Sequence, residues 1–162
     1  MSSKVNGLVE WILRSSFSGL LDRSVMLISV KGRRTGREYT LPVNYVDDDE
    51  QIWVLPGHPD RKTWWRNLSA ETPIRLRLRR MDLLATARAF RGDTDPATVV
   101  QGLRSYLRRF PRSARAVGIE SRGSEIAEDS VEQVAPRTVI VRIIPNHDRG
   151  ADLPGARGPN VD

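Results

Sequence analysis

Residues 24–46, SVMLISVKGRRTGREYTLPVNYV, contain two segments rich in strand-forming residues on either side of a basic turn. The first segment, 24–31, ends at Gly32, and the second, 39–46, ends at a run of four acidic residues that is suited to a reverse turn. A third apolar segment, Gln51 to Leu55, stops at Pro56-Gly57. Short strands separated by turns of this kind predict an antiparallel meander.

Three further segments extend the strand pattern. Residues 73–80 alternate strictly, with apolar side chains on one face and Arg75, Arg77 and Arg79 on the other, which is typical of a half-buried strand. A turn at Met81-Asp82 is expected to lead into a strand over 83–90, and residues 137–144 form the last one. About six strands of this length predict a mainly β (α+β) fold in which an antiparallel barrel removes the sheet edges.

Two or three helices are expected beside the barrel. Residues 62–70 form a short helix with Thr63 as a candidate cap, and residues 96–109 form a second with Asp95 as a candidate cap. The signals over 110–136 are weak and predict loops with one short helix. The apolar spacing in the first residues predicts an amphipathic helix, a candidate for contact with a membrane surface.

The expected organisation is an N-terminal helix over 1–22, a barrel domain over 23–145 and a disordered tail over 146–162 that is rich in Pro and Gly. No apolar run approaches the roughly 20 residues of a membrane-spanning helix. The chain start lacks the apolar core of a secretory signal, so we expect a cytoplasmic protein.

The composition narrows the chemistry. There is no cysteine, which excludes disulfides, thiolate metal sites and thiol catalysis. The net charge is +6, and all but three of the 26 basic residues are arginine. Such a charge is compatible with nucleic-acid binding through a face such as 75–79, although aromatic residues are not interleaved with the arginines there.

Two segments are candidates for a functional site. The turn Gly32-Arg33-Arg34-Thr35-Gly36-Arg37 combines backbone freedom, a hydroxyl and three guanidinium groups, as an anion site does. Residues 56–68, PGHPDRKTWWRNL, join a basic loop to a helix that opens with two tryptophans, and aromatic walls suit a planar ring. Taken alone, the basic turn is more typical of a solvated turn, and at least one of the two tryptophans is expected to fill the core.

Acid–base and metal chemistry have few candidates. His58 is a candidate base, but no spacing of Ser, His and Asp indicates a hydrolytic triad. His147 lies in the predicted tail, and no metal-ligand pattern includes either histidine, so we expect no metal site.

In order and spacing, these segments resemble the deazaflavin-dependent nitroreductase and quinone reductase family of the flavin-binding split-barrel superfamily. The matching pieces are GRRTGREYTLPVNY, QIWVLPG, TWWRNLSAETPIRLRLR and TVIVRIIP. The chain departs from the family pattern at Tyr39, where a basic residue is common, and in the loop LPGHPDRK, which is shorter and has only Gly57.

The resemblance implies a six-stranded split barrel of the FMN-binding type and coenzyme F-420, an 8-hydroxy-5-deazaflavin with a phosphate and an oligoglutamate tail. It also implies hydride transfer from the reduced cofactor to a quinone, nitro compound or other small electrophile, which explains the missing acid–base pair. The turn would hold the acidic tail, and Pro42, Asn44, Trp64 and Asn67 would lie by the ring or phosphate. The cofactor-binding residues implied in this way are Arg33, Arg34, Thr35, Gly36, Arg37, Pro42, Asn44, Pro56, Gly57, His58, Arg61, Lys62, Trp64 and Asn67.

Three alternatives stay open on the sequence: a split barrel that binds FMN, FAD or haem, a cofactor carrier without enzyme activity, and a basic nucleic-acid module. The expected partner is a small-molecule acceptor. A homodimer is expected if the apolar face of Ile74, Leu76 and Leu78 is not covered within the chain.

Overall fold

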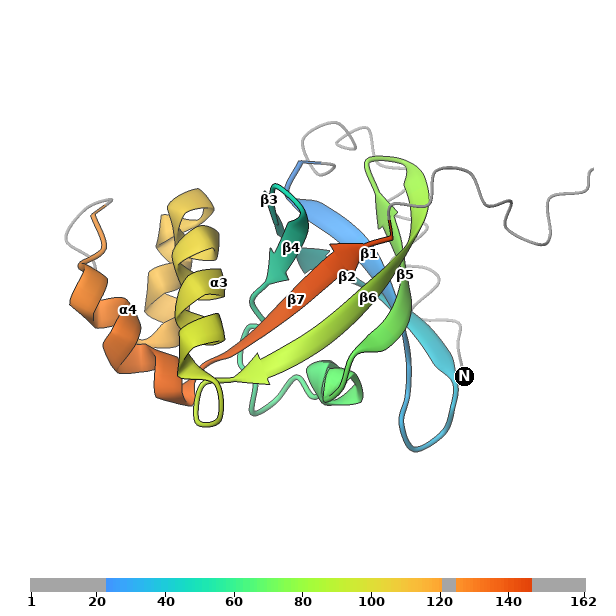
Figure 1. The fold of residues 1–162 in the computed structure, drawn as a ribbon, viewed down its shortest axis with the longest axis horizontal. Helices are drawn as coiled ribbons and strands as arrows, with labels where there is room; N and C mark the ends of the chain where they lie inside the picture. Colours follow the sequence, from blue (N-terminus) through green and yellow to red (C-terminus); the bar gives the residue numbers. More distant parts are fainter. Residues whose placement is uncertain (1–22, 121–124, 147–162) are drawn as a thin grey trace, which may run out of the picture.

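Seven antiparallel strands form one sheet in the order β2-β1-β5-β6-β7-β4-β3 (Figure 1). The computed structural model describes residues 23–120 and 125–146. The mainly β, barrel-like prediction is confirmed, with seven strands in place of six. The strands are β1 Val25–Lys31, β2 Glu38–Asn44, β3 Val46–Asp48, β4 Gln51–Val54, β5 Thr72–Leu78, β6 Met81–Arg91 and β7 Val139–Pro145.

Tyr45 is the point at which the sheet closes on itself. The strands β2 and β3 lie at opposite edges of the sheet, yet only Tyr45 separates them in sequence. Asn44 still pairs with Val25 of β1, whereas Val46 pairs with Trp53 of β4. A link of one residue between the two edges requires the sheet to curl into a split barrel. The prediction of one continuous strand over 39–46 is therefore wrong, because its two halves pair with different strands.

The barrel interior is filled by alternate residues of the strands. Ile74, Leu76 and Leu78 of β5 are at most 6% exposed, whereas the arginines between them face outward. Burial of each such side chain stabilises the fold by about 1.5–3 kcal/mol. A homodimer is expected from the sequence only if this apolar face of β5 is not covered within the chain. The chain itself covers the face, so it gives no support for a dimer.

The hairpin between β5 and β6 turns at Arg79-Arg80, which corrects the predicted turn at Met81-Asp82. Leu78 pairs directly with Met81, so the loop has two residues. Both have positive φ, 49° at Arg79 and 66° at Arg80. A tight hairpin needs this left-handed pair to match the twist of the strands, and Asn-Gly, its usual sequence signal, is missing here.

The helical layer lies at one end of the sheet (Figure 1). The helix α3, Pro96–Arg109, has the predicted bounds, and Asp95 caps it by accepting from the Thr98 backbone N–H at 3.1 Å. Gly102 lies against the Trp53 ring, so α3 covers the outer face of β4 and β7. The weakly patterned region after α3 holds more helix than expected. It contains η2 Pro111–Val117, α4 Glu128–Val134 and η3 Ala135–Arg137.

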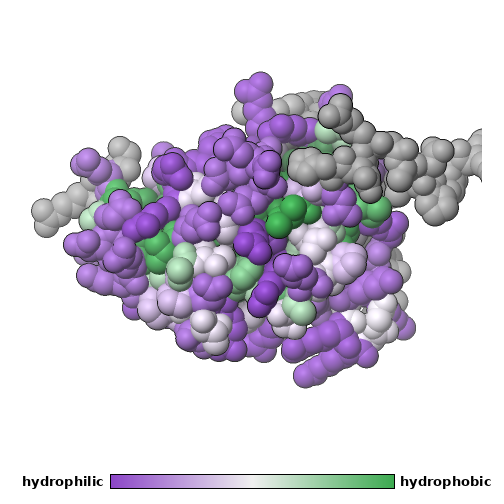
Figure 2. All heavy atoms as spheres, in the orientation of Figure 1, coloured by the Kyte–Doolittle hydropathy of each residue, from purple (hydrophilic) through white to green (hydrophobic). Residues whose placement is uncertain are grey.

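Two predicted segments lie outside the described residues: the N-terminal helix over 1–22, with its membrane contact, and the tail after residue 146. The proposed domain boundaries stay a prediction. Within residues 23–120 and 125–146, no helix has the length and apolar character needed to cross a membrane. The face drawn in Figure 2 is largely hydrophilic, with small hydrophobic patches between hydrophilic residues.

Candidate functional site

A 3-10 helix, η1, fixes one wall of the site. It spans Trp64–Leu68, which is shorter than the predicted helix, and Thr63 makes no capping hydrogen bond. Trp64 and Trp65 are each 8% exposed, and both belong to the barrel core with Leu68. The tryptophans therefore anchor η1 in the barrel end. The resemblance implies that Trp64 lies beside the cofactor ring, but its side chain has little exposed surface for such a contact.

The turn between β1 and β2 forms the opposite wall. Gly32 N donates to Arg37 O, and Gly36 N donates to Gly32 O, both at 2.8 Å. Gly36 has a φ of +66°, which favours glycine. Thr35 Oγ1 accepts a hydrogen bond from Arg37 N at 3.3 Å. The turn is thus closed by its own backbone, while the side chains of Arg33 and Arg34 are exposed.

Asn67 joins the two walls. Its Oδ1 accepts from Arg33 N at 2.9 Å, and its Nδ2 donates to Tyr39 Oη at 2.6 Å and to the Trp64 carbonyl at 3.0 Å. Both amide atoms therefore bond to the protein. The geometry makes Asn67 a residue that positions the turn against η1, in addition to its predicted place near the cofactor.

Between the walls lies a cavity of about 420 Å3, called here the turn cavity. It contains three arginine side chains and three hydroxyl groups, and no carboxylate lines it. Burial raises the pKa of Tyr39 above 10.0, and the hydrogen bond from Asn67 opposes this in part. The phenol is therefore protonated at neutral pH, and its oxygen already accepts from Asn67, which leaves its proton to donate. The lining residues are Gly32, Arg33, Arg34, Thr35, Tyr39, Thr63, Arg66 and Asn67.

A second cavity of about 490 Å3, called here the Arg91 cavity, shares Arg33 and Arg66 with the turn cavity. The guanidinium of Arg66 lies over the Trp65 ring, 5.4 Å from its centroid, at this shared boundary. The far wall comes from residues at the end of β6 and around η3, distant in sequence. Its lining residues are Arg33, Pro59, Asp60, Trp65, Arg66, Ser69, Arg91, Gly92, Asp93, Pro136, Arg137, Thr138 and Val139.

The predicted site residues fall into three groups. Arg33, Arg34, Thr35 and Asn67 line the turn cavity, with Gly36 and Arg37 in the turn that carries them. Pro42 and Asn44 lie further along β2, paired with Leu27 and Val25. The loop residues and Trp64 line neither cavity; these are Pro56, Gly57, His58, Arg61, Lys62 and Trp64.

The loop before η1 folds back on itself. His58 has a φ of 51°, and its carbonyl accepts from both Arg61 N and Lys62 N at 2.9 Å. Trp65 Nε1 donates to the Pro59 carbonyl at 3.1 Å and ties the loop to η1. The His58 side chain is exposed, so nothing in its surroundings equips it as a base.

Tyr39, Thr63 and Arg66 line the turn cavity, although the sequence does not predict them as site residues. In the sequence, Tyr39 is only a departure from the family pattern, and its position beside Asn67 depends on the fold. Thr63 and Arg66 flank the two tryptophans, one just before η1 and one within it, and this spacing is the signal in the sequence that points to them.

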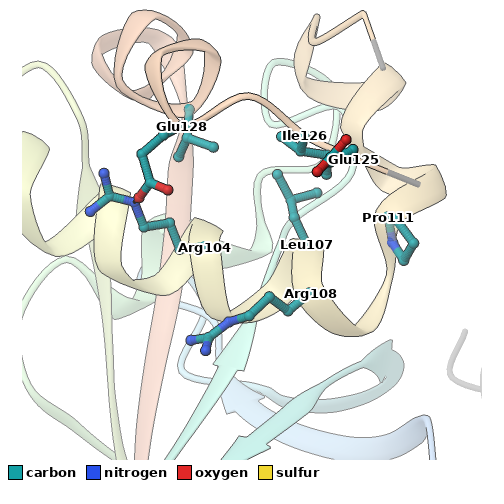
Figure 3. Close-up of a pocket in the computed structure, with 8 residues that line it drawn as sticks. Arg104, Leu107, Arg108, Pro111, Glu125, Ile126 and Glu128 are labelled. Atoms are coloured by element: carbon teal, nitrogen blue, oxygen red, sulfur yellow. The ribbon is translucent and has the colours of Figure 1, made fainter. Parts of the chain in front are cut away.

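A third cavity, of about 560 Å3, lies between α3 and α4 and shares no residue with the other two (Figure 3). Figure 3 shows Arg104 of α3 directed at Glu128 of α4; their Nε and Oε1 atoms are 2.7 Å apart. Arg104 also pairs with Glu132 at 3.0 Å. These contacts fasten one helix to the other. In the described part of the chain, no three His, Cys, Asp or Glu residues group as metal ligands.

The chemistry of the turn cavity fits an anion. Guanidinium, phenol and threonine donors converge there, while a flavin-type ring alone would offer them little charge to bind. A cofactor with a phosphate and carboxylates satisfies this donor set. The fold thus defines a split-barrel protein, and the turn cavity presents a donor set that is compatible with an anionic ligand.

Comparison with known proteins identifies the family to which the chain belongs. The family model of the F420H(2)-dependent quinone reductases matches residues 14–114, and the chain belongs to this family. It is a deazaflavin-dependent reductase, and its cofactor is coenzyme F-420. The predictions of family, reductase activity and cofactor are confirmed.

Solved structures agree on the fold. A chain described as a domain-swapped dimer is 19% identical, with a TM-score of 0.52, over 86% of this chain and 96% of the other. An F420-H2 dependent reductase, FDR-A, is 17% identical, also with a TM-score of 0.52, over 75% and 94%. No curated protein matches the chain in sequence.

Proposed function

We propose that the chain binds reduced coenzyme F-420 with the phosphate and the start of its acidic chain in the turn cavity, and that a small electrophile accepts the reducing equivalents. The observation that supports this is the double anchoring of the turn by Asn67, which holds three arginines around one space with no carboxylate. Preorganised donors lose less entropy when they bind an anion.

Each lining residue has its own part in this proposal. Arg33, Arg34 and Arg66 supply charge, and Thr35 and Thr63 supply hydroxyl donors. Tyr39 donates its phenolic proton, in the position where the family commonly has a basic residue. Neutral donors in this place fit a site that already holds three guanidinium groups within one cavity.

When bound, the coenzyme supplies the hydride that reduces the acceptor. Pro42 and Asn44 are the candidates for contact with its ring, because β2 leads from the turn to them over about 20 Å. The protein's residues then act by binding and orienting the cofactor. We assign no catalytic acid or base, and His58 does not qualify on its exposed position.

A fluorescence titration of the cofactor-free protein with F-420 tests the proposal, with FMN, FAD and haem titrated in parallel. Arg34→Ala is expected to weaken F-420 affinity by about 1–3 kcal/mol, the range for loss of a charged hydrogen bond. Arg108→Ala, which removes the same charge from an exposed position on α3, is the matched control. Equal affinity of Arg34→Ala and the native chain would remove the turn from the site.

The acceptor is proposed to be a quinone or a nitro compound. It is tested by following F-420 oxidation with a panel of both classes under anaerobic conditions. Turnover of neither class, with binding intact, would refute quinones and nitro compounds as the acceptors.

We also infer that two copies associate. Supporting this are the dimeric description of one structural relative and three exposed apolar side chains on β6 and β7, which are Met81, Leu84 and Ile144. Sedimentation at micromolar concentration tests it, and a monomer would refute it. The cytoplasmic location stays a prediction from the sequence.

The nucleic-acid alternative loses support from the outer face of β5. Arg75 pairs with Glu38, and Arg79, in the hairpin that follows β5, lies 3.5 Å from Asp47, so carboxylates lie beside two of the three arginines of the predicted face. Phosphate-dominated binding would also fall steeply with salt, which a DNA titration at two ionic strengths measures.

A further inference from the structure

We propose that the Arg91 cavity is a second subsite, which binds carboxylates of the coenzyme's oligoglutamate chain beyond those held in the turn cavity. The inference rests on the proposed function of the turn cavity. It assigns a binding role to Arg91 and Arg137, which lie far from the turn in sequence and outside every segment that suggested a site.

The charge of the Arg91 cavity is the first argument. Four arginines and two aspartates line it, an excess of two positive charges. Arg91 pairs with Asp93, with Nη2 and Oδ2 2.5 Å apart. Among the described residues, Arg33, Arg66 and Arg137 have no carboxylate partner. The four arginines outnumber the two aspartates, so the guanidinium groups repel each other in part, and a polycarboxylate chain would supply the missing negative charges.

Continuity with the turn cavity is the second argument. The two cavities share Arg33 and Arg66, so an anionic chain that leaves the first meets guanidinium groups at the boundary. Arg33 is fixed there through its backbone bond to Asn67, and Arg66 through its contact with the Trp65 ring. The boundary between the two cavities is therefore basic.

The far wall is rigid, which is the third argument. Gly92 N donates to Thr138 O at 2.9 Å, and Thr138 Oγ1 donates to Val134 O at 2.8 Å. A Cβ on Gly92 would lie 1.6 Å from the Ala135 carbonyl oxygen, so the β6 end and η3 are in direct backbone contact. This contact holds Arg91 and Arg137 on neighbouring segments in a fixed relation.

Arginine–carboxylate pairs at exposed positions are each weak, so the subsite is expected to act through their number. Affinity should rise with the number of glutamates, and the gain should shrink as salt rises, because exposed charges are screened. A coenzyme with no glutamate would reach only the turn cavity. Tail length is therefore the variable that separates the two subsites.

The test is a fluorescence titration with F-420 that carries no glutamate and with F-420 that carries a chain of several glutamates. For the native protein, the long chain is expected to bind about threefold to tenfold more tightly, the sum of a few exposed pairs. The double variant Arg91→Gln, Arg137→Gln is expected to lose this preference and to bind the glutamate-free form as the native protein does. Arg108→Gln, about 18 Å along α3 from its start and outside the lining of both cavities, is the control that should keep the preference.

The outcomes are distinguishable. If the native protein binds both forms equally, or the double variant keeps the tail preference, the subsite is refuted while the turn cavity stands. If neither form binds the native protein, the proposed function itself fails. Thermal unfolding of the cofactor-free double variant within about 2 °C of the native protein shows that the lost preference is not caused by lost folding.

Discussion

Replacement of Asn67 by alanine tests whether one side chain holds the site together. The change removes three hydrogen bonds, to Arg33 N, Tyr39 Oη and the Trp64 carbonyl. Each is worth about 0.5–1.5 kcal/mol, and the half-buried position lets water replace some of them. We therefore expect a loss of about 2 kcal/mol in the free energy of unfolding, or about 4–8 °C in Tm for a chain of this size.

Cofactor affinity should fall in the same variant, because Arg33 and Arg34 are carried by a turn that is no longer fixed to η1. A loss of about 1 kcal/mol, roughly fivefold in Kd, is expected for reduced preorganisation. Equilibrium unfolding in urea and a fluorescence titration measure the two effects separately. Asn146→Ala, at an exposed asparagine at the end of β7, is the control. A stability change below about 0.5 kcal/mol at Asn67 would refute the anchoring role.

Three further predictions concern the rest of the fold. Gly102→Ala is expected to cost about 1–3 kcal/mol in urea unfolding, because its Cβ would lie 2.5 Å from the Trp53 ring; a neutral effect would mean that α3 shifts freely. His58→Gly is expected to raise stability by about 0.5–1 kcal/mol by relieving its positive φ, and to leave reductase activity unchanged; lost activity would restore His58 as a catalytic candidate. Burial raises the pKa of Tyr106 to about 12 in the folded protein, whereas the pKa stays near 10 when the chain is unfolded. The buried, protonated phenol therefore contributes fully to the free energy of unfolding below pH 10, and this contribution is lost as the pH rises from 10 to 12. The free energy of unfolding of the native chain should therefore fall by about 2–3 kcal/mol more between pH 10 and 12 than that of Tyr106→Phe. Equal pH profiles for the two proteins would contradict the raised pKa of Tyr106.

The sequence predicts correctly those elements that are determined by neighbouring residues in the chain. The bounds of α3 follow from Pro96, the Asp95 cap and the helical spacing of apolar residues, all within one segment. The strict alternation of residues 74–78 likewise gave the buried face of β5. Neither feature depends on a distant part of the chain.

The predictions of the fold were wrong where strand pairing or backbone geometry, and not local propensity, determines the structure. The division of residues 39–46 at Tyr45 depends on which strand each half meets, and propensity carries no information on that. In the β5–β6 hairpin, Arg79 and Arg80 adopt positive φ, which arginine does not favour. Residues that usually mark such a turn, such as Asn-Gly, are therefore missing.

The candidate site was predicted in part for the same reason. The turn residues Arg33 to Thr35 were found because they are contiguous. Tyr39 and Arg66 enter the cavity only when β2 and η1 come together, and Arg91 and Arg137 only through the contact of Gly92 with Ala135.

The position of β7 in the sheet has a consequence for synthesis of the protein. It lies between β6 and β4, and among the described strands it alone pairs the β3–β4 hairpin with the rest of the sheet through hydrogen bonds. A two-stranded hairpin is marginally stable by itself in water. While residues 139–145 are still inside the ribosome, the hairpin at 46–54 therefore has no sheet to join. The nascent chain should gain protease resistance in one late step, when β7 emerges.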